Sequence, residues 1–121
     1  MNAKLTDVVS RLERGETVLE YKESGNSMVP LIHHQEPVTL SPVDREKLEK
    51  GDMVLVKVRG RWYIHKVLSV RGDQVQIGNN RGGVNGWTPR MHVYGIVTAV
   101  NGRPVGGTSV KIRRSLATTT R

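Results

Sequence analysis

The sequence predicts a mainly β domain with one short helix near its N-terminus. Apolar residues recur at helical spacing at the start of the chain. Farther along, short runs rich in Val, Ile and Leu alternate with Gly, Pro and Asn, which is typical of strands joined by turns. With 121 residues the chain forms one domain, because two halves would each bury too little surface.

Composition narrows the possible chemistry. Hydrophobic residues make up 36% of the chain and there are 13 glycines, which fits a globular domain with a small core. The chain has no cysteine, which excludes disulfides, a thiolate nucleophile and a Cys-ligated zinc, and fits a reducing cytoplasm. No apolar run is long enough to span a bilayer, so we expect a cytoplasmic protein.

The formal net charge of +8 favours anionic partners by long-range attraction but identifies none. Residues 1–110 are predicted to form the β domain, and the basic, aperiodic residues 111–121 a flexible tail. A solvated tail is the preferred interpretation, and a weak nucleic-acid contact through the basic surface is the alternative.

The first elements lead to a constrained serine. Apolar spacing predicts a helix over 3–14, and residues 17–22 form a strand pattern. Gly25 permits a positive-φ turn and Pro30 restricts the residue before it, so Ser27 should lie on a sharp corner. A corner exposes both Oγ and backbone N–H groups, as a nucleophile with an oxyanion hole requires, but an ordinary turn has the same pattern.

The middle of the chain reads as strands over 37–40, 53–58 and 62–70, with a charged loop or helical turn over 44–50. The adjacent His33 and His34 point in different directions and have no further ligand at useful spacing, so no metal is expected there. No cofactor is expected either. In the third strand, alternation places Tyr63 and His65 on one face and Lys66 on the other.

The last part of the chain contains a strand over 75–77, a Gly- and Asn-rich loop over 78–87 and a strand over 92–100. The loop matches no phosphate-binding motif, and it either brings amide groups to the serine corner or is a plain surface loop. Asn101-Gly102 predicts a type I′ hairpin turn into a short return strand.

Five segments occur in an order that resembles the signal peptidase and LexA-type superfamily of serine peptidases. They are Ser24–Pro30, Gly51–Val56, Tyr63–Val67, Gly72–Val75 and Tyr94–Val97. The resemblance covers most of the chain and implies the coiled, partly barrel-like β fold of that superfamily.

The resemblance also implies the catalytic groups. It makes Ser27 the nucleophile and places His65 at the position of the general base, as in the endoplasmic-reticulum and archaeal branch where histidine replaces lysine. Lys66 is then expected to face solvent or a partner. The oxyanion hole would be the Ser27 N–H, with help from the Asn26 N–H or the Ser24 hydroxyl.

One departure from the histidine branch concerns the acid that assists the base. The resembled proteins carry acidic residues after the following strand, where this chain has no Asp or Glu through Arg90. Asn79, Asn80 or Asn85 could orient the histidine instead, as in Cys-His-Asn peptidases, in a slower site or one without turnover.

The sequence therefore predicts a soluble serine endopeptidase that uses Ser27 and His65 on another protein as substrate. The alternative is a peptidase-fold module, weakly active or inactive, that binds a protein or nucleic acid. The 26 residues before Ser27 are too few for a helix-turn-helix domain with a cleavable linker, which argues against a DNA-binding repressor. The chain would suit a phage or bacterial protein.

Overall fold

The computed structural model describes residues 3–105 of the chain, as one helix, eight strands and two short 3₁₀ turns. The helix α1 spans Ala3–Glu13, and the 3₁₀ turns η1 and η2 span Arg45–Lys47 and Arg90–His92. The strands are β1 (Val18–Tyr21), β2 (Val38–Ser41), β3 (Met53–Val58), β4 (Arg61–Arg71), β5 (Gln74–Gly78), β6 (Val84–Pro89), β7 (Val93–Val100) and β8 (Arg103–Pro104).

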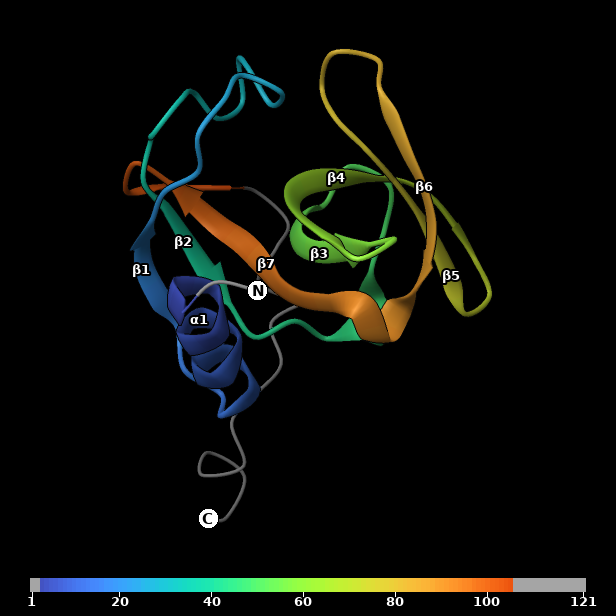
Figure 1. The fold of residues 1–121 in the computed structure, drawn as a ribbon, viewed down its shortest axis with the longest axis horizontal. Coiled ribbons are helices and arrows are strands. Elements are labelled where there is room, and N and C mark those ends of the chain that lie inside the picture. The colour runs from blue at the N-terminus through green and yellow to red at the C-terminus, as the bar shows by residue number, and fades with distance from the viewer. Residues whose placement is uncertain (1–2, 106–121) are drawn as a thin grey trace.

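All eight strands belong to one antiparallel sheet with the order β1-β2-β7-β3-β4-β5-β6, and β8 pairs with β7 (Figure 1). The sheet does not close, since β1 and β6 are its two edges. The long strand β7 joins β2 to the β3-β4 hairpin, so segments distant in sequence share one ladder. The mainly β prediction with one short N-terminal helix is confirmed.

Strand β3 separates two hydrophobic cores, because its successive side chains point to opposite faces. Met53 and Leu55 enter a helix-side core, and Val54, Val56 and Val58 enter a hairpin-side core. The helix-side core also contains the buried residues of α1, β1 and β2, and the hairpin-side core those of β5. Both cores include residues of β4 and β7, which hold the two parts together.

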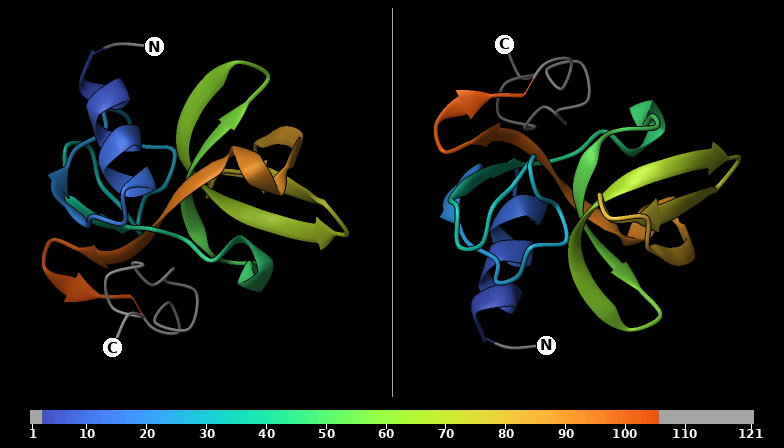
Figure 2. Two further views of the ribbon diagram at one scale, coloured as in Figure 1. Left: turned by 90° about the horizontal axis from the view of Figure 1, so that it is seen from below. Right: turned by 90° about the horizontal axis from the view of Figure 1, so that it is seen from above.

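Helix α1 covers the β1-β2-β7 part of the sheet (Figure 2). Its buried stripe has the predicted helical spacing: Leu5, Val8, Val9 and Leu12. The helix lies close to β7 at Gly95, where an added Cβ would be 2.9 Å from Leu12 Cδ1.

The predicted strands lie where the sequence placed them, to within one or two residues at their ends, with one exception. The expected loop over 78–87 contains the start of β6 at Val84, which pairs along β5. At the other end of the sheet, Asn101 and Gly102 both have positive φ, 50° and 79°, which confirms the type I′ turn.

The predicted tail over 111–121 lies outside the described residues. Within residues 3–105, no helix combines the length and the apolar character that crossing a membrane requires.

Candidate active site

The Ser27 corner lies in the connection between β1 and β2, and this connection is tied together across its own width. Gly25 has φ 101°, which confirms the predicted positive-φ turn, and its N–H donates to Nδ1 of His34 at 2.8 Å. Gln35 makes two further ties: its backbone N–H donates to Glu23 O, and its Nε2 donates to Ser24 Oγ at 2.8 Å. These contacts fix the segment that precedes the serine.

His65 reaches the corner from the middle of β4, where it pairs with Val54 of β3. The distance from Ser27 Oγ to His65 Nε2 is 3.0 Å, within hydrogen-bond reach, although 38 positions separate the two residues. Only 6% of His65 is exposed, so its ring is held by its surroundings. The serine and the imidazole therefore meet, as the sequence predicted.

The second ring nitrogen of His65 contacts Asn85 of β6, with 2.7 Å between Nδ1 and Oδ1. An amide oxygen only accepts hydrogen bonds, so Nδ1 must carry the proton and Nε2 is left unprotonated. Nε2 can then accept the hydroxyl proton of Ser27. Ser27, His65 and Asn85 thus form a hydrogen-bonded series in which the unprotonated Nε2 faces the hydroxyl, as a general base requires.

A β-bulge places Asn85 at His65. In the β5-β6 ladder Ile77 pairs with Gly86 while Gly78 pairs with Val84, so Asn85 is the extra residue of β6. A bulge redirects the side chain that it carries, and bulges are frequent beside active sites. Gly86, with φ 125°, supplies a backbone conformation that other residues rarely adopt.

The surroundings of His65 favour its neutral form. Burial lowers the pKa of His65 below its usual value of 6.5, while the hydrogen bond to Asn85 acts in the opposite direction. The Tyr63 ring, from the same strand face, stacks on the imidazole with centroids 4.7 Å apart and an interplanar angle of 25°. A general base must be unprotonated before it accepts a proton, and the neutral imidazole is in that state.

Lys66, expected to face solvent or a partner, makes a contact within the chain. It is half-buried and its Nζ donates to Asn80 Oδ1 at 2.8 Å. Asn80 in turn holds the serine corner, since its N–H donates to Ser27 O at 2.8 Å and its Nδ2 donates to Val29 O at 3.0 Å. The pair supports the backbone around Ser27, and Lys66 makes no hydrogen bond to its hydroxyl.

The three candidate asparagines therefore have different positions. Asn79 accepts from the N–H groups of Arg81 and Gly83, which closes the turn before β6, and Asn80 binds the serine corner. Asn85 is the one that contacts His65. The sequence could not separate them, because the bulge register is set by pairing with β5.

The groups predicted for the oxyanion hole belong to the serine corner. Within residues 3–105, the backbone N–H groups of Asn26 and Ser27 donate no hydrogen bond. The Ser24 hydroxyl accepts from Gln35 and still has its own proton to donate. Ser24, Asn26 and Ser27 all line the same pocket.

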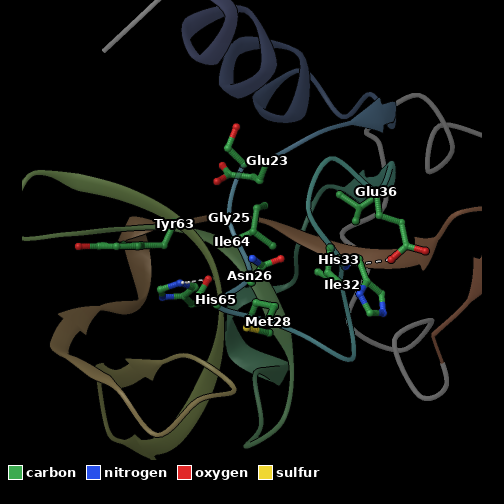
Figure 3. Close-up of a pocket in the computed structure, with 13 residues that line it drawn as sticks. Glu23, Gly25, Asn26, Met28, Ile32, His33, Glu36, Tyr63, Ile64 and His65 are labelled. Carbon is green, nitrogen blue, oxygen red and sulfur yellow. Dashed lines mark hydrogen bonds between the residues drawn. The ribbon is translucent and has the colours of Figure 1, made fainter.

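The pocket has a volume of about 340 Å³, and Ser27 and His65 line it. Figure 3 shows His65 at the pocket wall. Apolar side chains of Met28, Ile32 and Ile64 contribute to its lining. Glu23 and Glu36 also line it. Sequence reasoning assigned no role to these two acids, and their only signal was their position on either side of the serine corner.

Other functional groups were also missed. His34, considered only as a metal ligand, and Gln35, to which no role was assigned, are the partners of Gly25 and Ser24. In the part of the chain that the structure describes, no group of three or more His, Asp or Glu side chains could hold a metal ion.

Comparisons of the chain with protein-family models, with curated proteins and with solved structures found no match.

Proposed function

We propose that this protein is a serine endopeptidase that cleaves another protein through Ser27 and His65. The observation that carries the proposal is the hydrogen-bonded series Ser27 Oγ, His65 and Asn85, with heavy-atom distances of 3.0 Å and 2.7 Å, at the wall of a pocket. A hydroxyl, an oriented base and a cavity that admits a side chain are the parts that acyl transfer requires.

The reaction follows from the positions of these groups. His65 Nε2 takes the proton of Ser27 Oγ while Oγ forms a bond to the carbonyl carbon of the substrate. The backbone N–H groups of Asn26 and Ser27 donate to the oxyanion of the tetrahedral intermediate. His65 then gives the proton to the leaving amine as the C–N bond breaks. Water, deprotonated by the same nitrogen, then forms a bond to the acyl carbon; the bond from that carbon to Ser27 Oγ breaks, and His65 returns the proton to Oγ.

Asn85 has a positioning role in this scheme. Its oxygen keeps the His65 proton on Nδ1, which leaves Nε2 free for the serine. A neutral amide stabilises an imidazolium less than a carboxylate does, so the proposed enzyme is slower than one with an acid at this place.

The order of sequence motifs supports the same chemistry. The serine box, the Gly-Asp strand and the His-Lys strand resemble signal peptidase and LexA-type serine peptidases, in which such a serine is the nucleophile. We propose that the open, twisted sheet is a version of the coiled β fold of that superfamily, with histidine in place of lysine as the base.

The test is cleavage of a proteome-derived peptide library by the full chain, with new peptide N-termini identified by mass spectrometry. We expect cleavage that falls about 10³-fold or more in Ser27→Ala and in His65→Ala. Lys66→Met should lower cleavage far less than either of these changes, because Lys66 acts on the hydroxyl only indirectly, through Asn80 and the backbone around Ser27.

Absence of any cleavage by the wild-type chain, or equal cleavage by Ser27→Ala, would contradict the proposal. A folded wild-type chain that binds peptides or nucleic acid without turnover would then favour the binding module instead.

A further inference from the structure

The charge of the pocket beside Ser27 is opposite to that of the chain. The chain has a formal net charge of +8, with 19 Lys and Arg residues against 11 Asp and Glu residues. The pocket lining nevertheless contains two carboxylates, Glu23 and Glu36, and neither lysine nor arginine. A cationic group that enters this pocket meets acids, while cations elsewhere on the surface are repelled.

Glu23 is held at the end of β1 with one carboxylate oxygen engaged. Its Oε2 accepts from the Tyr21 hydroxyl at 2.9 Å; among the described residues no hydrogen bond or salt bridge to Oε1 is found, although Lys4 attracts the carboxylate electrostatically. Burial raises the pKa of Glu23, against the lowering effects of Tyr21 and the nearby Lys4. A partly buried carboxylate of this kind is stabilised by a cation beside it.

Glu36 enters the pocket from the segment before β2. Its Oε1 accepts from the backbone N–H of His33 at 3.0 Å. Its Oε2 lies 3.8 Å from a guanidinium nitrogen of Arg103, a side chain that is 79% exposed while that of Glu36 is 15% exposed. Such a long, solvent-facing pair is weak, so Arg103 does not neutralise the acid within the pocket.

The remaining walls suit an aliphatic stem. Four apolar residues of the helix-side core line the pocket: Met28, Ile32, Val38 and Ile64. In the view of Figure 3, His65 lies on one side of this apolar floor, with Glu36 on the opposite side and Glu23 above. Lysine and arginine have this composition: methylene groups that pack on apolar surface and a charged end that stays polar.

We propose that this pocket binds a lysine or arginine side chain of the substrate, with Glu23 and Glu36 as the residues that determine this specificity. The proposal rests on the proposed peptidase function, since it places the cationic residue next to the bond that Ser27 attacks. A neutral aliphatic side chain would fill the same walls but bring no positive charge into the pocket to meet the two acids.

Binding can be tested without turnover. The full-length Ser27→Ala protein is titrated with the N-acetyl, N-methylamide derivatives of lysine and of norleucine, and amide chemical shifts are followed by NMR. We expect the lysine derivative to bind about tenfold or more tightly than norleucine, which has the same stem without the ammonium group. The shifts should centre on Glu23, Gly25 and Ile64.

Glutamine variants identify the acids responsible. Glu23→Gln still accepts from Tyr21 and Glu36→Gln still accepts from His33, so both preserve the local hydrogen bonds. The double variant should lose the preference for lysine, and Glu46→Gln, an exposed acid away from this pocket, should keep it. Equal binding of both derivatives, or a preference that survives the double variant, would overturn the inference.

The peptide library separates this inference from the function on which it rests. Cleavage with lysine or arginine at one fixed position, lost in the double glutamine variant, supports both. Cleavage without that preference, with equal binding of the two derivatives, overturns the inference and leaves the peptidase. Selective lysine binding without any cleavage overturns the peptidase and leaves a pocket for cationic side chains.

Discussion

The hydrogen bonds of His65 determine which of its two ring nitrogens carries the proton. Its two ring nitrogens have different partners, a hydroxyl and an amide oxygen, and only one tautomer satisfies both. The sequence predicted the pairing of Ser27 with His65 through its resemblance to the signal peptidase and LexA-type superfamily, and strand alternation placed His65 and Lys66 on opposite faces. It could not predict that Lys66 would bind Asn80, since that contact depends on where the chain returns after β5.

Substitutions of Asn85 test its role in orienting His65. Asn85→Asp places a carboxylate on Nδ1, which stabilises the imidazolium, so the pKa of His65 should rise and kcat should increase. Asn85→Ala removes the orienting oxygen and should lower kcat about 10²-fold. Steady-state kinetics on one cleaved peptide measures both. A decrease of kcat in Asn85→Asp with an unchanged fold would contradict the orienting role.

The pH dependence of the wild-type chain follows from the same residue. Burial lowers the pKa of His65, so the unprotonated base persists below pH 6.5 and is lost only as the pH falls through that lower value. The acid limb of kcat/KM should therefore lie below pH 6.5, and Asn85→Asp should move it upward. An acid limb above the ordinary histidine value in the wild-type chain would not fit a buried base.

Strand β6 is the element that was not predicted from the sequence. Glycine and asparagine are depleted in strands, so Val84-Asn85-Gly86 looks like a loop, and only pairing with β5 makes it a strand. The other strands were predictable because their Val, Ile and Leu runs are long enough to show their period. The bulge that presents Asn85 is a property of two strands together, which no single segment reveals.

Substitution of Gly86 tests the importance of the bulge. At φ 125° an alanine is strained, so the backbone must shift. The added Cβ itself has room, because the nearest atoms, in Arg59, lie at ordinary contact distances. Gly86→Ala should lower kcat/KM about tenfold or more by moving Asn85 away from His65. Gly82→Ala introduces a similar strain at φ 90° in the preceding turn and serves as the control. Equal losses of kcat/KM in both variants would contradict a role of the bulge in positioning Asn85.

At the scale of the whole molecule, β3, β4 and β7 join the two cores, and His65 lies on β4. Leu55 of the helix-side core and Val56 of the hairpin-side core are neighbours in β3, and both are fully buried. The corner that carries Ser27 adds Met28 to the helix-side core, while Asn85 comes from the edge beyond the hairpin-side core. The site therefore depends on both cores being folded together.

This arrangement predicts one cooperative unfolding transition. Trp62 packs on the helix-side core and Trp87 lies on β6, so the variants Trp87→Phe and Trp62→Phe each leave one fluorescent reporter. Their urea midpoints should coincide within error. Leu55→Ala should lower the free energy of unfolding by about 2–5 kcal/mol at both reporters. Two separate midpoints would show that the cores fold independently.

The most direct measurement is covalent labelling of the full chain by a fluorophosphonate probe, read by intact mass and by peptide mapping. We expect a single adduct on Ser27 Oγ, lost in His65→Gln and retained in Lys66→Met. A chain that is folded but unlabelled, or a Ser27 adduct that forms as fast in His65→Gln, would contradict the activation of Ser27 by His65.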